Sequence, residues 1–172
     1  MKRLAVLATA LALTGCTTAH HDYPEATPYT ESANAMAEVD AALLRATAAD
    51  KRVLLVMGAD WCHDSRALAG WLETPRLAAL VEKHYELLFV NAGTPQTSEG
   101  SNLDIARRFG IADLPGTPNV FVLTPSGALV NTDTVTTWRN AASRSEDAIY
   151  AELAELAVRP VYSPVPGAEI AE

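Results

Sequence analysis

The sequence predicts an α/β protein in which helices cover both faces of a mixed sheet. Residues 53–57 and 85–90 are short, nearly continuous apolar runs, as in strands that are buried on both faces. Segments with helical spacing of apolar residues alternate with these runs, which favours parallel strands joined by crossover helices. A turn signal at residues 124–127 adds an antiparallel hairpin. We therefore expect a three-layer α/β/α sandwich that ends in a hairpin and a helix.

Each element has its own signal along the chain. Thr74 and Pro75 suit the N-cap and the first residue of a helix, and Gly110 suits a helix C-terminus. Apolar residues at helical spacing indicate the other helices. We expect helices at residues 32–50, 65–73, 76–84, 102–109 and 146–158, and strands at 53–57, 85–90, 120–123 and 128–130.

The N-terminus has the pattern of an export signal. Lys2 and Arg3 precede a ten-residue apolar region, 4–13, which is too short to span a membrane. The ending Leu13-Thr14-Gly15-Cys16 resembles the lipobox of bacterial lipoproteins, in which the cysteine is acylated and becomes the first residue of the mature chain. The resemblance implies a lipid anchor on Cys16, which holds a protein on a membrane without spanning it. Because no aspartate follows Cys16, we expect the outer membrane, facing the periplasm. Ordinary export without lipid is the alternative.

These patterns divide the chain into four parts. The Thr-, Pro- and acid-rich stretch after Cys16 has no periodicity, and it reads as a flexible tether. The predicted parts are a signal peptide at 1–15, the lipidated cysteine and its tether at 16–31, one folded domain at 32–158 and a Pro-rich tail at 159–172.

Charge and histidine content exclude several functions. The formal net charge is −8 for the whole chain, and loss of the signal peptide would make it more negative still. No run of basic residues is present to neutralise phosphates, so we expect no nucleic-acid binding. The four histidines do not have the spacing of a zinc site. We expect neither a metal nor another cofactor.

The most informative motif is Trp61-Cys62-His63-Asp64-Ser65, directly after the first predicted strand. Cys62 is the only cysteine beyond Cys16. A cysteine at the start of a helix meets unpaired backbone N–H groups, which favour the nucleophilic thiolate. The residue three positions on is Ser65, so Cys62 cannot close a C-x-x-C disulfide. An inert buried thiol is the structural alternative.

The chain resembles the thioredoxin superfamily over residues 32–158. The segment 58–65 is similar to the family's active site, and Gly116-Thr117-Pro118 followed by an apolar strand is similar to its second signature. The resemblance implies that Pro118 follows a cis peptide bond and faces Cys62. Thr117 would then pair with an extended substrate backbone, and Trp61 would form one wall of the site.

The motif also departs from the family pattern. Two-cysteine thioredoxins carry a buried acid on the strand before the tryptophan, and Val56 stands at that position. Protonated His63 would stabilise the Cys62 thiolate, whereas Asp64 would oppose it. Ser65 is able to donate a hydrogen bond to the thiolate but not to attack a mixed disulfide. Asp64 and Ser65 also suit the first turn of a helix for capping alone.

The resemblance implies a monothiol thiol-disulfide oxidoreductase or isomerase. Cys62 would form mixed disulfides with client proteins or glutathione, and a thiol from outside the chain would release it. Loss of both the second cysteine and the buried acid also fits a non-catalytic module that binds proteins through the same fold. A copper or haem-maturation accessory is a weaker alternative, because one thiol and the adjacent His63 make a poor metal site.

Overall fold

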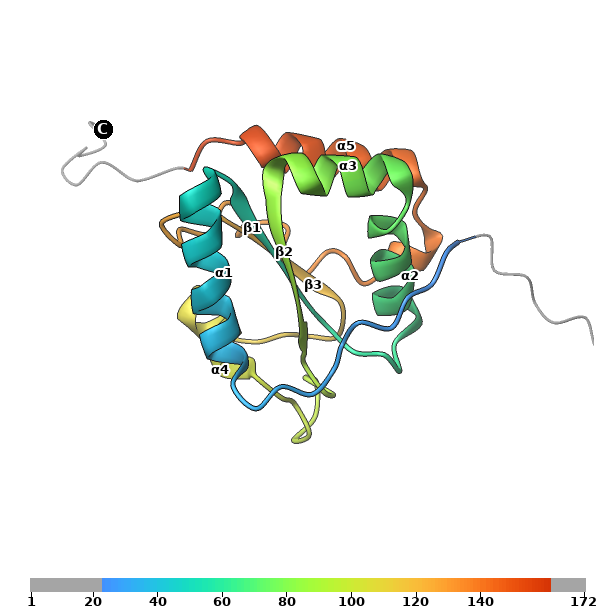
Figure 1. Ribbon diagram of the computed structural model, residues 1–172. Helices are drawn as coiled ribbons and strands as arrows, with labels where there is room; N and C mark the ends of the chain where they lie inside the picture. Colours follow the sequence, from blue (N-terminus) through green and yellow to red (C-terminus); the bar gives the residue numbers. More distant parts are fainter. Residues whose placement is uncertain (1–22, 162–172) are drawn as a thin grey trace, which may run out of the picture.

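Five α-helices surround a three-stranded sheet in residues 23–161, the part of the chain that the computed structural model describes (Figure 1). The predicted signal peptide, Cys16 and most of the tail lie outside the described residues. The elements are α1 (Ala35–Ala49), β1 (Arg52–Gly58), α2 (His63–Leu72), α3 (Pro75–His84), β2 (Tyr85–Asn91), α4 (Leu103–Arg108), β3 (Asn119–Leu123), the 3-10 turn η1 (Ala141–Ser143) and α5 (Glu146–Val158).

The sheet is mixed, with the strand order β2-β1-β3. β1 and β2 are parallel, and Arg52 pairs with Tyr85 at one end and Gly58 with Asn91 at the other. β3 is antiparallel to β1. The α/β class and the mixed sheet are confirmed.

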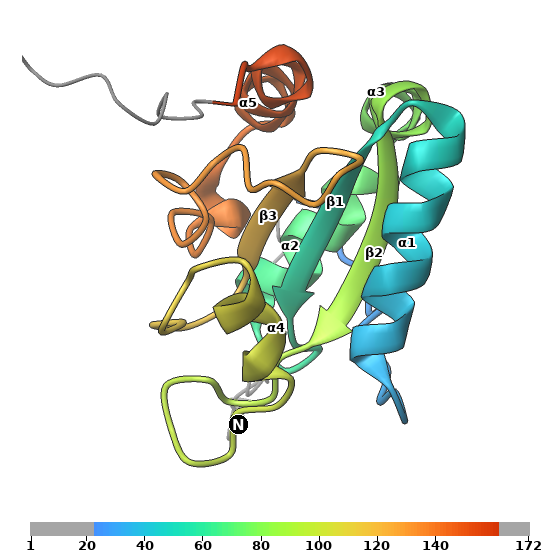
Figure 2. The same ribbon diagram turned by 90° about the vertical axis from the view of Figure 1, so that its left-hand side faces the viewer.

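The side chains of β1 alternate between two apolar cores. Leu54 and Val56 face the core that includes residues of α2, α3 and α5, whereas Leu55 and Met57 face the core that includes residues of α1 and α4. All four are fully buried. Figures 1 and 2 show α1 and α4 on one side of the sheet and α2 on the other. Helices α3 and α5 lie across the end of the sheet where β1 and β2 begin. This arrangement is the predicted three-layer sandwich.

Local sequence signals set the helix ends. Thr74 is the N-cap of α3 and Pro75 its first residue, as predicted. Gly110 has a positive φ of 83°, and its N–H donates to Arg107 while the N–H of Ile111 donates to Ala106. This pair of hydrogen bonds is a Schellman motif, which explains why α4 ends where glycine follows.

The predicted hairpin after β3 is only partly formed. The turn closes through the N–H of Thr124, which donates to Ala128, but the returning arm makes a single bridge, between Leu123 and Leu129. Fully buried Asn131 takes over the pairing: its side-chain amide donates to the Val120 carbonyl and accepts from the Val122 N–H. The backbone N–H of Val130 donates to the Val122 carbonyl at 2.8 Å, and the Asn131 side chain continues the pairing beyond the predicted strand.

The predicted tether is structured over its last residues. Residues 24–31 pack along α2 and the end of the sheet, and Tyr29 is only 2% exposed (Figure 1). Part of the predicted tether therefore packs against the folded domain, in an irregular conformation without helix or strand. The reason is that Tyr29 is a large apolar side chain that enters the core, although its neighbours show no periodic pattern.

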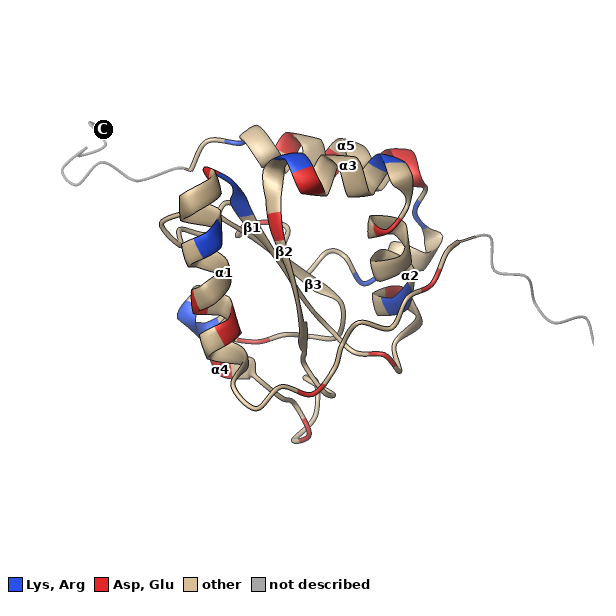
Figure 3. Cartoon of the chain, viewed as in Figure 1, with Lys and Arg blue, Asp and Glu red and all other residues tan. Residues whose placement is uncertain are grey.

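Ion pairs join the helices to one another and to the sheet. Arg76 of α3 pairs with Asp147 of α5, and Arg45 of α1 pairs with Glu86 of β2 at 3.1 Å. Figure 3 shows basic and acidic residues distributed over several helices. Within residues 23–161, no helix has the length and apolar character that a membrane span requires.

Candidate functional site

Three segments that are distant in sequence meet at one end of the sheet. The parallel strands β1 and β2 end there at Gly58 and Asn91, and the antiparallel strand β3 begins there at Asn119. The turn after Gly58 carries Cys62, and the segment before Asn119 carries Thr117. The topology therefore brings the two sequence motifs together.

Cys62 is the N-cap residue of α2, which begins at His63. Its backbone N–H donates to the Ala59 carbonyl at 3.0 Å and closes the turn that follows β1. Its thiol donates a hydrogen bond to the Thr117 carbonyl, with 3.4 Å between Sγ and oxygen. Only 8% of Cys62 is exposed. The sulfur thus lies at a helix N-terminus, where backbone N–H groups stabilise negative charge.

The Thr117-Pro118 peptide bond is cis, as the sequence resemblance implied. Among residues 23–161, none accepts a hydrogen bond from the Thr117 backbone N–H, and the buried Thr117 hydroxyl has no partner either. Buried polar groups without partners are uncommon in folded proteins. The Thr117 backbone N–H is thus an unused donor in the residue whose carbonyl accepts from Cys62.

Trp61, the neighbour of Cys62 in the chain, is exposed. Its residue surface is 57% exposed, unlike most large apolar side chains of the chain. Its indole N–H donates to the Gly93 carbonyl at 3.1 Å, so the ring is fixed to the loop that follows β2. A fixed, exposed aromatic side chain is a common feature of surfaces that bind other proteins.

His63 faces Asp64 rather than Cys62. The imidazole Nε2 lies 3.1 Å from one carboxylate oxygen of Asp64. The other oxygen accepts a hydrogen bond from the Ala142 backbone N–H at 2.8 Å. The Asp64 carboxylate is thereby engaged on both sides, and the interaction that the structure gives His63 is with Asp64.

Ser65 is fully buried beneath the turn that carries Cys62. Its hydroxyl oxygen accepts a hydrogen bond from the Ala59 backbone N–H at 3.3 Å. The predicted hydrogen bond to the Cys62 sulfur is not among those of the described residues. The hydroxyl instead ties the start of α2 to the end of β1, which is a structural role.

Comparison with known proteins decides the family. The family model for thioredoxin-like domains matches residues 34–125, which include Cys62, Thr117 and Pro118. The chain belongs to the thioredoxin-like family.

A solved structure supports this assignment. The crystal structure of a disulphide isomerase from Xylella fastidiosa Temecula1 is 32% identical in sequence, with a TM-score of 0.66. The match covers 76% of this chain and 97% of that chain. No curated protein matches the chain.

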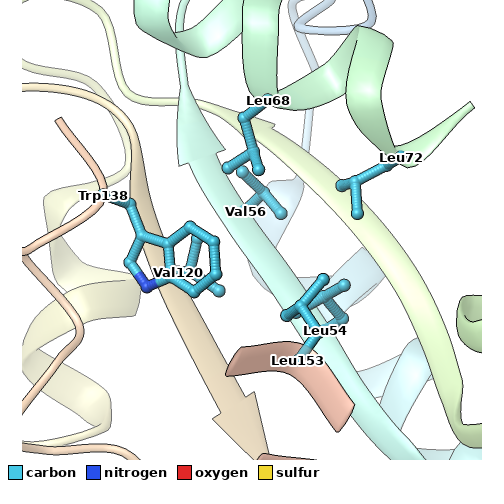
Figure 4. A pocket seen from close by; sticks show the side chains of 7 residues that line it. All are labelled: Leu54, Val56, Leu68, Leu72, Val120, Trp138 and Leu153. Carbon is cyan, nitrogen blue, oxygen red and sulfur yellow. The ribbon is translucent and has the colours of Figure 1, made fainter. Parts of the chain in front are cut away.

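The thioredoxin-like site here has an apolar environment at Val56, where the family resemblance places an acid. Val56 is fully buried, and Trp138 lies across from it (Figure 4). The side chains around this point close on one another without room for a water molecule; they are Leu54, Val56, Leu68, Leu72, Val120, Trp138 and Leu153. None of these seven side chains carries a carboxylate.

Sequence reasoning missed the contribution of Tyr29 to this site. The Tyr29 hydroxyl donates to the Ser65 carbonyl at 3.3 Å, and its backbone N–H donates to the Asp60 carboxylate at 3.2 Å. Burial, followed by the proximity of Cys62, raises the pKa of the Tyr29 phenol far above its usual range. Two glycines were the sequence signal that could have indicated this packing. Gly58 and Gly70 stand where the chain of residues 24–31 approaches closely.

The described residues offer no metal centre. Residues 23–161 contain no cluster of three or more His, Cys, Asp or Glu side chains arranged to hold a metal ion.

Proposed function

We propose that this thioredoxin-like protein is a monothiol thiol-disulfide oxidoreductase or isomerase that acts through Cys62. The observation that carries the proposal is the position of Cys62 Sγ, at the N-terminus of α2 and 3.4 Å from the carbonyl of the cis Thr117-Pro118 pair. Similarity to the Xylella disulphide isomerase supports the same reaction class.

The first step is thiol-disulfide exchange. The Cys62 thiolate attacks one sulfur of a client disulfide, and the client S–S bond breaks as the Cys62–client bond forms. The second client sulfur leaves as a thiolate with the bonding electrons. The thiol proton, which Cys62 shares with the Thr117 carbonyl in the resting state, is lost before the attack. Its loss frees that carbonyl for a backbone N–H of the client.

Release must use a thiol from outside the chain. Ser65 has no sulfur with which to attack the mixed disulfide, and Val56 stands in place of the acid that would activate such a thiol. A different thiol of the client therefore attacks the client sulfur of the mixed disulfide and expels the Cys62 thiolate. Attack by the thiolate released in the first step would only re-form the original disulfide. When both thiols belong to the client, the exchange rearranges its disulfides without net oxidation or reduction. Isomerisation fits a single cysteine better than net reduction, which would require glutathione or another thiol donor.

Two features would hold a client beside the sulfur. The unpaired backbone N–H and the carbonyl of Thr117 would pair with an extended segment, and Trp61 would cover its apolar side chains. Main-chain pairing is insensitive to sequence. We therefore expect clients to be unfolded or misfolded proteins with accessible disulfides.

The predicted lipid anchor would hold this site close to a membrane. Only residues 17–23 lie between Cys16 and Pro24, where the chain already packs on α2. Even when fully extended, this length spans at most about 28 Å. If acylated Cys16 is anchored in the outer membrane, the site would meet its clients near the periplasmic surface of that membrane.

A non-catalytic binding module is the second candidate. It is favoured by the low exposure of Cys62, 8%, and by the engagement of Ser65 and Asp64 in structural hydrogen bonds. In that case the surface formed by Trp61 and Thr117 would bind clients without covalent chemistry.

Purified protein distinguishes the two candidates. In a Cys16→Ser chain, Cys62 is the only thiol, so any mixed disulfide reports on this residue. We expect this chain to form a mixed disulfide with oxidised glutathione and to accelerate the refolding of a protein with scrambled disulfides. The Cys62→Ala variant of the same chain is the control. Equal client binding by both chains, without refolding activity, would favour the binding module.

A further inference from the structure

The chain before the family-matched region forms part of the wall of the site. We call residues 24–31 the N-terminal strap, and they precede the matched residues 34–125. The strap runs along α2: the Ala26 N–H donates to the Arg66 carbonyl at 3.1 Å, and the Glu25 carboxylate pairs with the Arg66 guanidinium at 3.3 Å. An added Cβ on Gly70 would lie 2.5 Å from the Pro24 backbone. The strap therefore lies in close backbone contact with α2, and Tyr29 is its buried residue.

Tyr29 is the central residue of the strap. Its ring lies directly on Gly58, where an added Cβ would be 2.5 Å from ring atoms. The ring also meets Phe89 edge-on, with 5.3 Å between centroids. Its backbone N–H donates to the Asp60 carboxylate, and its hydroxyl donates to the Ser65 carbonyl. One side chain and its own backbone thus contact the residues on both sides of Cys62.

Other contacts close this arrangement around the turn. The Arg66 guanidinium, already paired with Glu25 of the strap, donates to the Asp60 carbonyl at 3.0 Å. The Ser65 hydroxyl accepts from the Ala59 N–H. Residues 59–66 are therefore fixed on the strap side at Asp60, Ser65 and Arg66. The thiol of Cys62 in the same turn donates to the Thr117 carbonyl.

We propose that Tyr29 is a positioning residue that holds the Cys62 turn against Thr117, so that the N-terminal strap is part of the reactive site. The catalytic part of this inference rests on the proposed thiol-disulfide exchange. The contacts of Tyr29 with the Cys62 turn do not depend on that proposal. A thioredoxin-like domain cut at residue 32 would keep the family signatures and lose this support. The buried phenol stays neutral in the range where thiols ionise, so it remains a hydrogen-bond donor throughout.

Tyr85 supplies a matched control. It is as deeply buried as Tyr29, at 2% exposure, and its hydroxyl also donates to a backbone carbonyl, that of Leu153, at 2.6 Å. It begins β2 at the end of the sheet opposite to Cys62. Loss of either hydroxyl should destabilise the fold to a similar degree, but only Tyr29 contacts the turn.

The test compares Tyr29→Phe, Tyr29→Leu and Tyr85→Phe in the Cys16→Ser chain with two readouts. The first is hydrogen exchange of the Ala59 and Cys62 amides, measured against amides in the middle of β1. The second is a ratio of two rates: the rate at which Cys62 reacts with a disulfide-bonded peptide, divided by the rate at which it reacts with iodoacetamide. The peptide must pair beside Thr117, whereas the small reagent need not, so the ratio reports on the position of the sulfur.

We expect Tyr29→Leu to lower the rate ratio by about tenfold or more, because a displacement of about 1 Å costs up to about 100-fold in rate. Tyr29→Phe should lower it by about fivefold, the effect of one hydrogen bond. Both should speed exchange at Ala59 and Cys62, and Tyr85→Phe should change neither readout. Equal effects of Tyr29→Leu and Tyr85→Phe on the exchange of these amides would overturn the inference. If the unsubstituted chain fails to react with the peptide, the proposed function fails, and the exchange data alone decide the role of Tyr29.

Discussion

The carboxylate of Asp64 accepts a hydrogen bond from the backbone N–H of Ala142 at 2.8 Å. Asp64 lies in the first turn of α2, and Ala142 lies in η1, the 3-10 turn that precedes α5. The acid next to Cys62 therefore joins the reactive helix to the segment that follows β3. Its second oxygen faces His63, so both oxygens have partners within the fold.

Removing the Asp64 carboxylate should destabilise the protein. Asp64→Ala leaves the Ala142 N–H without a partner, which we expect to cost about 1–3 kcal/mol in the free energy of unfolding. Asp64→Asn keeps an oxygen at the same place and should cost less. Asp113→Ala, at an exposed loop position, is the control. Urea unfolding measures all three. Equal stability of Asp64→Ala and Asp113→Ala would contradict a structural role for Asp64.

Gly70→Ala tests the packing of the N-terminal strap. Alanine is favoured over glycine inside a helix by about 1 kcal/mol. Here the added Cβ would lie 2.5 Å from the Pro24 carbonyl, and backbone does not yield easily. We expect the substitution to destabilise the full chain and to make residues 24–31 sensitive to protease. In a chain that begins at residue 32, the same substitution should stabilise the domain. Stabilisation in both chains would show that the strap is not packed at Gly70.

The two buried tyrosines predict instability at high pH. Burial raises the pKa of the Tyr29 and Tyr85 phenols above the usual value. Above about pH 10 the unfolded chain releases these protons while the folded chain keeps them, so stability falls as pH rises. Each phenol contributes about 1.4 kcal/mol per pH unit. Stability should therefore fall less steeply in a Tyr29→Phe, Tyr85→Phe double variant than in the unsubstituted chain. Urea unfolding measures the free energy of unfolding of both chains between about pH 10 and 12. If it falls equally steeply in both, these phenols titrate normally.

Ser65→Cys tests the absence of a resolving thiol. The new sulfur would sit at a fully buried position three residues after Cys62, where the family carries its second cysteine. We expect Cys62–glutathione adducts, which should accumulate in the Cys16→Ser chain, to be resolved into an internal disulfide. Mass spectrometry of the oxidised proteins measures both species. Ser126→Cys, in the turn after β3, is the control for a second thiol elsewhere. Adducts that persist equally in both variants would mean that position 65 cannot reach the mixed disulfide.

Most of the fold could be predicted because its signals are local. Thr74-Pro75 and Gly110 mark helix ends by their own backbone chemistry, and the apolar runs of β1 and β2 need no partner to be recognised. The meeting of Cys62 with Thr117 was implied by the family resemblance of the two motifs that carry them. These features are properties of short segments.

The features that the sequence did not reveal depend on long-range contacts. Tyr29 is buried because Gly58 leaves room for its ring, and the two residues are far apart in the chain. Asn131 pairs with β3 through its side-chain amide, which bonds to the backbone of Val120 and Val122. The hydrogen bonds of Ser65 and Asp64 depend on the position of α2 against its neighbours. None of these pairings has a periodic signature.

The most direct test of the central claim is the state of Cys62 in its native setting. The protein would be isolated from its own cells under acid quench with thiols blocked, and Cys62 examined by mass spectrometry. We predict that a fraction of Cys62 carries glutathione or specific proteins through disulfides that reduction removes. Cys62 that is uniformly free, and that resists alkylation until the protein unfolds, would contradict a reacting monothiol and favour the binding module.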